Sequence, residues 1–574
     1  MKRILSYLIP YRWRIALGLT IKFTGTIMDL LLPWILSYLI DTIVPRRSMV
    51  QIVIWGIAMA VCAVIALVTN VIANRMASRV AQRCTQAIRH DLFSRISYLS
   101  CSQIDKFTIP SLESRLTTDT YNIHQMIGMM QRLGVRAPIL LLGGVTLTLM
   151  LEPVLATVMI CTLPLLGAVV FTVSKRGIPL YSSLQRAIDR MVRTVRENIT
   201  GIRVIKALSK TDYEKSRFKE VNGEVVRREK KAGITMALTN PAMNLFLNLG
   251  LACVILVGAV RVNAGLTQPG KILAFLTYFT IILNALLSIT RIFVMISKAT
   301  ASAERIREVL DEPDDLTLSE SKGGAKDLHI AFNNVSFAYG GSKEILHNIN
   351  FELLRGQTLG ILGATGSGKS TIVSLLMRMY DADCGEILID GENVKSLKPQ
   401  KLNTKFGVVF QNDFIYADSI RANIDFGRGL TDSQIEKAAR CAQAMEFIQS
   451  LDDGFDHQLS AKGTNLSGGQ KQRLLIARAL AANPEILVLD DSSSALDYRT
   501  DARLRQALRE QYKDTTTIII AQRISSIKHC DHILVLDDGK EIGYGTHQEL
   551  LESCEVYRQI SQSQMGGVDV AART

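Results

Sequence analysis

Paired cysteines are missing from this sequence. Its nine cysteines form no C-x-x-C pair and no metal-ligand spacing, and Cys62, Cys161 and Cys253 lie inside apolar runs. This pattern excludes a disulfide-stapled extracellular fold and a zinc framework, and it predicts reduced cysteines in a chain whose soluble parts face a reducing compartment. Nothing at the start of the sequence resembles a cleavable signal, because Met1–Arg14 is short, basic and amphipathic, a pattern that predicts a helix at a membrane surface.

Apolar sequence, in contrast, is abundant. Hydrophobic residues make up 48% of the 574 residues, and the mean hydropathy of +0.19 is unusual for a soluble protein. The net charge of +13 is compatible with nucleic-acid binding. However, the lysines and arginines of the first half flank its apolar runs, as expected for the cytoplasmic side of a membrane protein. The sequence therefore predicts a bilayer as a partner and no nucleic acid.

Six runs are apolar enough to cross a bilayer, which takes about 20 helical residues. They lie at roughly 15–44, 50–74, 137–151, 154–173, 243–262 and 272–297, and Glu152-Pro153 separates the third from the fourth. An even number places both ends of the chain on one side of the membrane. Because the N-terminus is basic, that side is predicted to be the cytoplasm.

The connections between the runs predict the rest of the membrane domain. Those after the first, third and fifth runs are short, and those after the second and fourth are long, polar and helical in pattern. We therefore expect long helices that project into the cytoplasm, with transverse coupling segments near 106–117 and 204–218. The membrane domain is predicted to span 1–305, followed by an acidic linker at 306–327.

The second half of the chain contains a phosphate-binding motif, GATGSGKST, at residues 363–371. GATGSGKST follows the apolar strand TLGIL and precedes a helical pattern. Glycines in such a loop let backbone N–H groups surround phosphate oxygens, and the helix that follows presents its positive end. Lys369 is expected on the β- and γ-phosphates, and Ser370 on Mg²⁺. The candidate ATP-binding residues in this motif are Gly363, Thr365, Gly366, Ser367, Gly368, Lys369, Ser370 and Thr371.

Two further motifs follow in order. The apolar strand ILVLD ends at Asp490, which is expected beside the Mg²⁺ of a bound nucleotide. Between this strand and the phosphate-binding loop lies NLSGGQKQR, residues 465–473. With these motifs and six preceding spans, nearly the whole chain resembles the ATP-binding cassette (ABC) half-transporters of type IV exporter architecture.

That resemblance implies an architecture and an activity. The expected fold is an all-α six-helix transmembrane domain with long cytoplasmic extensions, followed by an α/β P-loop nucleotide-binding domain at 328–574. The expected ligands are ATP and Mg²⁺, and the expected activity is that of a transport ATPase. Two nucleotide-binding domains would enclose two ATP molecules head to tail, so a second half-transporter chain is an expected partner.

The resemblance also assigns residues outside the P-loop. Tyr339 matches the aromatic residue that stacks on adenine. Gln411 matches the glutamine that senses Mg²⁺, and Asp497, in SALD, matches the loop that crosses the dimer interface. Ser467 and Gly469 match groups that reach the γ-phosphate held by the opposite subunit. The signature residues expected to bind ATP are Ser467, Gly468, Gly469 and Gln470.

Three positions depart from the family pattern. Asp491 stands where the family has the glutamate that activates water, and Gln522 stands where it has a histidine near the γ-phosphate. Shortening a carboxylate side chain by one methylene moves it by about 1 Å, a displacement that can cost about 10²-fold in rate. Glutamine can neither transfer a proton nor become cationic. Ala461 replaces a glutamate ahead of the signature, which puts the details of coupling in doubt.

These departures predict a degenerate ATP site, with Asp491, Gln522 and Gln411 at the catalytic positions. The chain is then one half of a heterodimeric exporter, and its intact LSGGQ completes a hydrolytic site of the partner. Slow turnover as a homodimer is the competing interpretation. The sequence favours export of hydrophobic or amphipathic compounds, as in multidrug export, across a bacterial inner membrane. Import of a metal chelate such as a siderophore and an ATP-gated, non-pumping membrane protein remain alternatives.

Four charged residues in or at the edge of the spans bear on the substrate: Lys22, Asp29, Arg136 and Arg291. Intramembrane charges face protein or water rather than lipid. Mutual pairing, snorkelling to the interface and substrate contact are all compatible with their positions.

Overall fold

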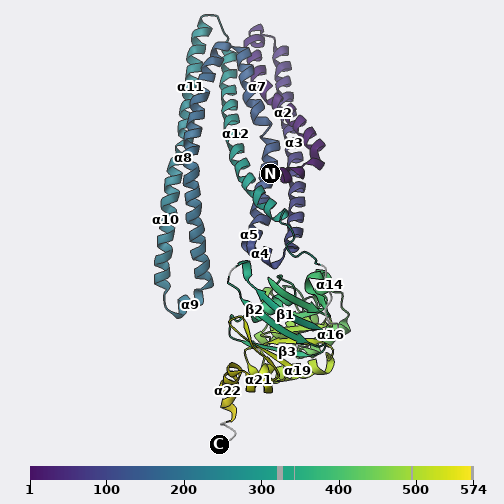
Figure 1. Cartoon of the computed structure of the whole chain (residues 1–574). Helices are drawn as coiled ribbons and strands as arrows, with labels where there is room; N and C mark the ends of the chain where they lie inside the picture. Colours follow the sequence, from purple (N-terminus) through teal and green to yellow (C-terminus); the bar gives the residue numbers. More distant parts are fainter. Residues whose placement is uncertain (320–327, 342, 493–495, 570–574) are drawn as a thin grey trace. The chain divides into compact units, whose positions relative to one another are not determined.

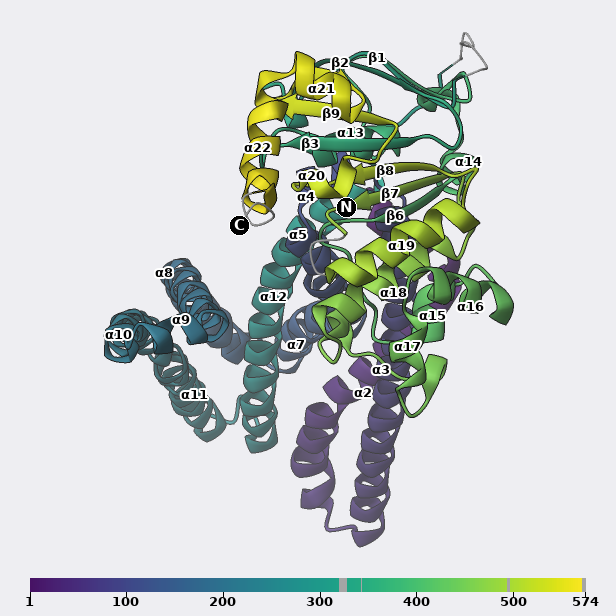
Figure 2. The same cartoon turned by 90° about the horizontal axis from the view of Figure 1, so that it is seen from below.

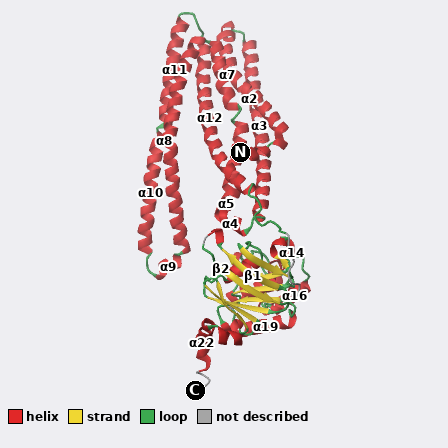
Figure 3. Cartoon of the chain, in the orientation of Figure 1, coloured by secondary structure: helices red, strands yellow, loops and turns green. Residues whose placement is uncertain are grey.

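The chain folds into two compact units. The computed structural model describes residues 1–319, 328–341, 343–492 and 496–569. The first unit comprises residues 1–97 and 110–312, and the second comprises 98–109 and 313–574. The described part of the first unit is helical, whereas the second combines strands with helices (Figure 3). A short segment of the N-terminal half, 98–109, therefore belongs to the second unit.

Helices of the first unit are long (Figure 1). Their bounds are α1 Lys2–Ser6, α2 Arg12–Tyr38, α3 Met49–Ser97, α5 Ile109–Ser114, α6 Thr120–Arg132, α7 Arg136–Leu151, α8 Pro153–Thr200, α9 Ile202–Ala207, α10 Thr211–Ala237, α11 Thr239–Asn263 and α12 Pro269–Leu310. The predicted break at Glu152-Pro153 is confirmed, since α7 ends at Leu151 and Pro153 opens α8. Proline is well suited to a first helical position, where its missing N–H is not needed.

Membrane-spanning helices account for most of this unit. Among the described residues, five helical stretches are long and apolar enough to cross a bilayer, and Pro153–Thr162 in α8 is a shorter apolar stretch. The five stretches are Arg3–Arg46, Met49–Ser97, Ile109–Leu151, Thr211–Asn263 and Pro269–Leu310. The predicted fourth span, 154–173, lies in α8 but is not counted among the five.

Helix α12 organises the packing of this unit. It lies against α2, α6, α7 and α11. Tyr278 of α12 is completely buried, and its hydroxyl donates a hydrogen bond to the Leu30 carbonyl at 2.6 Å. Farther along α12, the Arg305 Nε donates to the fully buried carboxylate of Asp119 at 2.8 Å. Because α12 ends only at Leu310, the helix continues past the predicted domain end at 305.

Short helices lie at both predicted coupling segments. Helices α4, Cys101–Phe107, and α5 overlap the range 106–117, and α9, Ile202–Ala207, overlaps the start of 204–218, while the coupling role of these ranges stays a prediction. Helix α4 begins where it does because Ser100 and Gln103 form a capping box: the Ser100 Oγ accepts from the Gln103 N–H at 3.1 Å, and the Gln103 Oε1 accepts from the Ser100 N–H at 3.3 Å. Helix α8 ends next to Gly201, which caps it.

One sheet of ten strands forms the second unit. Its order is β5-β4-β1-β2-β10-β9-β3-β8-β7-β6. The bounds are β1 Ile330–Phe337, β2 Leu346–Leu353, β3 Thr358–Gly363, β4 Cys384–Ile389, β5 Glu392–Asn393, β6 Phe406–Val409, β7 Ile486–Asp490, β8 Thr516–Ile520, β9 His532–Asp537 and β10 Lys540–Gly545. Strand β3 is parallel to β8 and β9, and β7 is parallel to β6 and β8. Their carboxyl ends therefore meet at one edge, where ligands bind in open α/β sheets.

The remaining helices surround this sheet (Figure 2). Their bounds are α13 Lys369–Leu376, α14 Pro399–Asn403, α15 Ile420–Asp425, α16 Asp432–Cys441, α17 Met445–Gln449, α18 Gly468–Leu480, α19 Tyr498–Gln511, α20 Ile524–Ile527, α21 His547–Ser553 and α22 Glu555–Asp569. Helix α18 packs against β6 and also against α15 and α16. The signature sequence thus opens a helix that joins a helical layer to the sheet.

Candidate functional site

The phosphate-binding loop has the geometry that its sequence predicts. Strand β3 ends at Gly363 and α13 begins at Lys369. Between them, Gly366 and Gly368 have φ values of +87° and +94°, a region that residues with a Cβ rarely occupy. The Lys369 Nζ donates to the carbonyls of Gly363 at 2.9 Å and Ala364 at 2.7 Å. Burial lowers the pKa of Lys369, while Asp490 and Asp491 act in the opposite direction.

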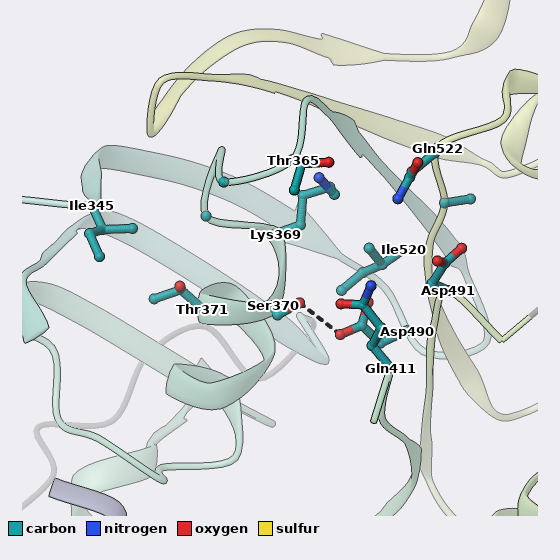
Figure 4. Close-up of a pocket in the computed structure, with 13 residues that line it drawn as sticks. Ile345, Thr365, Lys369, Ser370, Thr371, Gln411, Asp490, Asp491, Ile520 and Gln522 are labelled. Carbon is teal, nitrogen blue, oxygen red and sulfur yellow. Dashed lines mark hydrogen bonds between the residues drawn. The ribbon is translucent and has the colours of Figure 1, made fainter. Parts of the chain in front are cut away.

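A cavity of about 270 Å³ opens beside this loop. Figure 4 shows Ile345 and Thr371 on one side of it and Asp491 and Gln522 on the other. The residues that line it are Ile345, Thr365, Gly366, Gly368, Lys369, Ser370, Thr371, Gln411, Asp490, Asp491, Ile520, Ala521 and Gln522. The structure thus gathers the predicted P-loop, strand-end and degenerate positions around one space.

Oxygen atoms from three segments, α13, the end of β7 and the loop after β6, line this cavity. The Ser370 Oγ donates to the Asp490 Oδ2 at 2.7 Å, shown as the dashed line in Figure 4. Asp490 is only 4% exposed, and burial raises its pKa, as does the neighbouring Asp491. Hydroxyl, carboxylate and amide oxygens from Ser370, Asp490 and Gln411 are the ligands that Mg²⁺ prefers. The donor set therefore fits Mg²⁺.

Asp491 and Gln522 approach the cavity from the ends of neighbouring strands. Asp491 follows β7 with φ +50°, and its N–H donates to the Ile520 carbonyl at 3.0 Å. Gln522 follows β8, and its backbone carbonyl accepts a hydrogen bond from the Gln564 Nε2 at 3.0 Å. Both side chains are placed by parallel strands, so the two departures from the family pattern occupy one wall of the cavity.

Tyr339 lies apart from that wall. Its hydroxyl donates to the Thr371 Oγ1 at 3.3 Å, and its ring makes an edge contact with Tyr380, with centroids 5.0 Å apart. Tyr380 in turn donates to the Asp105 carboxylate of α4 at 2.7 Å. Tyr339, Tyr380 and Asp105 line a second cavity of about 710 Å³.

The signature residues do not line the P-loop cavity of their own chain. Ser467 caps α18, with its Oγ accepting from the Gln470 N–H at 3.3 Å, and Gly468 and Gly469 form the first turn of that helix. Asp497 caps α19, with its Oδ1 accepting from the Thr500 N–H at 2.9 Å. Ser494, from the same SALD motif as Asp497, lies outside the described residues.

Sequence reasoning missed several residues of the site. Ile345, Ile520 and Ala521 line the cavity, but an apolar residue near a strand end carries no signal of its own. Gln564 is a larger omission. It lies in α22, its Oε1 accepts from the Ile524 N–H at 2.8 Å, and no motif marks it.

Comparison with known proteins identifies the family. A model of the ABC transporter transmembrane region matches residues 15–286, and an ABC transporter model matches 346–494. An uncharacterized ABC transporter ATP-binding protein of Bacillus subtilis (strain 168), YfiB, is 35% identical over 99% of both chains. The chain is an ABC transporter. It has the half-transporter organisation, with one helical membrane domain and one nucleotide-binding domain, and it is a multi-pass integral membrane protein.

Two other matches describe this ABC transporter further. The structure of a bacterial Atm1-family ABC exporter with ATP bound superposes with a TM-score of 0.81, at 25% identity, and the match covers 96% of this chain and 98% of that one. A fatty acid ABC transporter ATP-binding/permease protein of Mycobacterium bovis (strain ATCC BAA-935 / AF2122/97) is 32% identical over 83% of this chain and 76% of its own. The ABC transporter therefore has the exporter fold, and its nucleotide-binding domain is that of a transport ATPase.

Proposed function

We propose that this ABC transporter is the ATP-holding half of a heterodimeric exporter, with a degenerate site of its own. The observation that carries the proposal is that Asp491 and Gln522 line the same cavity as Lys369, Ser370 and Asp490. The parts that bind phosphate are present, and the parts that activate water are altered. Such a site retains nucleotide and hydrolyses it slowly.

Binding of the nucleotide is assigned to the P-loop and its neighbours. Lys369 orients the β- and γ-phosphates, and the N–H groups of the loop and of the first turn of α13 surround them. Ser370, Asp490 and Gln411 would hold Mg²⁺. When bound, this ion would neutralise part of the charge of the phosphates. Tyr339 provides a ring for the adenine.

Slow hydrolysis follows from the two altered side chains. The Asp491 carboxylate reaches less far than a glutamate would, and such a displacement weakens proton abstraction from water. The Gln522 amide donates a hydrogen bond but carries no charge at any pH. ATP then stabilises the closed state of the dimer for longer than a hydrolytic site does.

The signature residues are assigned to the partner's site. Ser467 is exposed at the start of α18, and neither Ser467 nor Gly469 lines this chain's own cavity, as a head-to-tail dimer requires. In this arrangement the partner supplies the catalytic glutamate and histidine of the hydrolytic site, and this chain supplies LSGGQ. Both nucleotide-binding domains are assigned to the cytoplasmic side of a bacterial inner membrane.

Export of hydrophobic or amphipathic compounds is the proposed transport activity. The exporter fold of the Atm1-family neighbour supports the direction, and the name of the mycobacterial relative, a fatty acid ABC transporter, supports an amphipathic substrate. The substrates of multidrug exporters belong to the same class of hydrophobic or amphipathic compounds.

The decisive experiment compares the purified full-length chain alone with the chain co-purified with a second half-transporter that carries glutamate and histidine at the corresponding positions. We expect ATP binding in both samples and rapid phosphate release only in the second. Rapid release by the chain alone, abolished by Asp491→Asn, would contradict the degenerate-site assignment.

A further inference from the structure

A cluster of positive charge lies inside the membrane unit, where α2, α3, α6 and α7 meet. Within the part of the chain that the structure describes, it consists of Lys22, Arg132 and Arg136 around one acid, Asp29, and these three other charges act on Lys22 electrostatically. Three cations and one carboxylate leave an excess of two positive charges. Unbalanced charge is costly among apolar helices, so a cluster of this kind calls for an anionic counterpart.

Lys22 is the most deeply placed of these cations. It is 2% exposed, and its Nζ donates to the Asn74 Oδ1 at 3.1 Å. Among the described residues no carboxylate oxygen lies within ion-pair distance of it. A lysine that only marks the cytoplasmic membrane surface extends its ammonium into the interface. Lys22 instead lies within the helix bundle, held by a neutral amide.

The one carboxylate is already engaged. The Asp29 Oδ2 accepts from the Arg136 Nη2 at 3.0 Å and from the Asn70 Nδ2 at 3.5 Å. This leaves the Arg136 Nε and the Asn70 Oδ1 buried without hydrogen-bond partners. The Arg132 Nε donates a hydrogen bond to the Gly128 carbonyl at 3.1 Å, within its own helix. The cluster therefore holds one buried donor, the Arg136 Nε, and one buried acceptor, the Asn70 Oδ1, that the protein does not satisfy.

The backbone beneath the cluster is closely packed. A Cβ at Gly25 would lie 2.4 Å from the Thr69 Oγ1 and 3.1 Å from the Asn70 Nδ2, so α2 and α3 are in close contact there. The two helices run side by side in Figure 1. Lys22 and Asn74 are consequently held by a fixed helix pair. Asn74 is the last residue of the predicted span 50–74, and Arg136 directly precedes the predicted span 137–151. The cluster therefore lies at one end of both spans.

We propose that Lys22, Arg132 and Arg136 form a binding site for the anionic head group of an amphipathic substrate, a carboxylate or a phosphate, whose apolar body lies among the spans. This inference rests on the proposed export of amphipathic compounds and narrows that class to acids. Asp29 holds Arg136 in place and limits the net charge, so that the site attracts an anion and still releases it.

Two probes with the same tail test the head-group requirement. We would measure the binding of oleate and of methyl oleate to the purified full-length protein in nanodiscs of neutral lipid, without nucleotide. We expect oleate to bind at least about tenfold more tightly, a difference of about 1.4 kcal/mol. Repeating the oleate titration with phosphatidylglycerol in the disc distinguishes a free acid from a membrane lipid, because a bound phospholipid head group would compete.

Variants that remove a positive or a negative charge test the cluster, because they should change oleate binding in opposite directions. Lys22→Met should weaken oleate binding about tenfold and leave methyl oleate unchanged, while Lys22→Arg should restore it and Asp29→Asn should strengthen it. Arg291→Gln, a cation outside the cluster, is the matched control and should behave as wild type. Equal affinity for the two probes, or an equal loss of both in Lys22→Met, would overturn the proposal. Neither result bears on the ATP site, which is tested by phosphate release.

Discussion

At the scale of single residues, we expect the side chains at positions 491 and 522 to set how fast the site hydrolyses ATP. Asp491→Glu with Gln522→His should raise hydrolysis at this site by about 10²-fold, because the carboxylate regains its reach and the amide becomes a titratable ring. The measurement is phosphate release from the dimer whose partner carries a disabling change at its own catalytic glutamate. Asp491→Asn is the control and should leave the slow rate unchanged. A fast wild-type rate that Asp491→Asn lowers would contradict the assignment.

His329 gives a second prediction at this scale. Its side chain is fully buried beside β8, its Nδ1 lies 2.6 Å from the Thr516 Oγ1, and its Nε2 lies 3.7 Å from the Asp390 carboxylate. Burial lowers the pKa of His329, and Asp390 offsets part of that effect.

The unfolded chain therefore binds more protons than the folded one below about pH 6.5. The contribution of neutral His329 to the stability of the folded state is complete above that pH, and it is lost as the pH falls below it. We expect the melting temperature of the full-length protein to fall more steeply between about pH 7.5 and 5.5 in wild type than in His329→Gln. Parallel curves would show that His329 does not titrate differently in the two states.

At the scale of helices and strands, the sequence predicted the elements that short local motifs specify. The strand, loop and helix around the P-loop follow from apolar β3 and from glycines with positive φ, and Asp490 does end a buried strand. The start of α4 was also encoded, in the Ser100 and Gln103 capping box, but its short motif was not recognised within a long polar stretch.

Tertiary hydrogen bonds could not be predicted in this way. Helix α22 reaches the loop after β8 only because the fold brings residues 42 positions apart together. The Gln564 amide then makes two bonds to that loop: it donates to the Gln522 carbonyl and accepts from the Ile524 N–H. We expect these bonds to hold the backbone on either side of Arg523 and so to position the Gln522 side chain.

Removing this contact should loosen the loop. In Gln564→Ala both bonds are lost, and the Ile524 amide should exchange its hydrogen about fivefold faster, as expected for a net contribution of about 1 kcal/mol. Gln564→Glu keeps the acceptor and should protect Ile524 as wild type does. Hydrogen exchange of the peptide that spans Gln522–Ile527 measures the effect. Gln562→Ala, an exposed position on the same helix, is the control, and an equal effect there would mean that α22 acts through its fold rather than through this amide.

At the scale of the whole molecule, the proposed heterodimer would be asymmetric, because its two nucleotide sites would differ in activity. In this proposal Gly469 belongs to the partner's hydrolytic site, and Lys369 belongs to the slow site. Gly469→Asp places a carboxylate against the partner's γ-phosphate, where loss of transition-state stabilisation costs about 10²-fold. Lys369→Met weakens ATP binding only at the site that contributes little turnover.

Steady-state phosphate release from the purified dimer should therefore fall about 100-fold with Gly469→Asp and by only a few-fold with Lys369→Met. The matched control is the same glycine-to-aspartate change in the partner's signature, which touches only the slow site and should retain most of the activity. Equal losses from both glycine changes would mean that the two sites hydrolyse ATP alike. That outcome would remove the functional meaning of Asp491 and Gln522, because a dimer with two equal sites has no need of a chain that binds ATP without cleaving it.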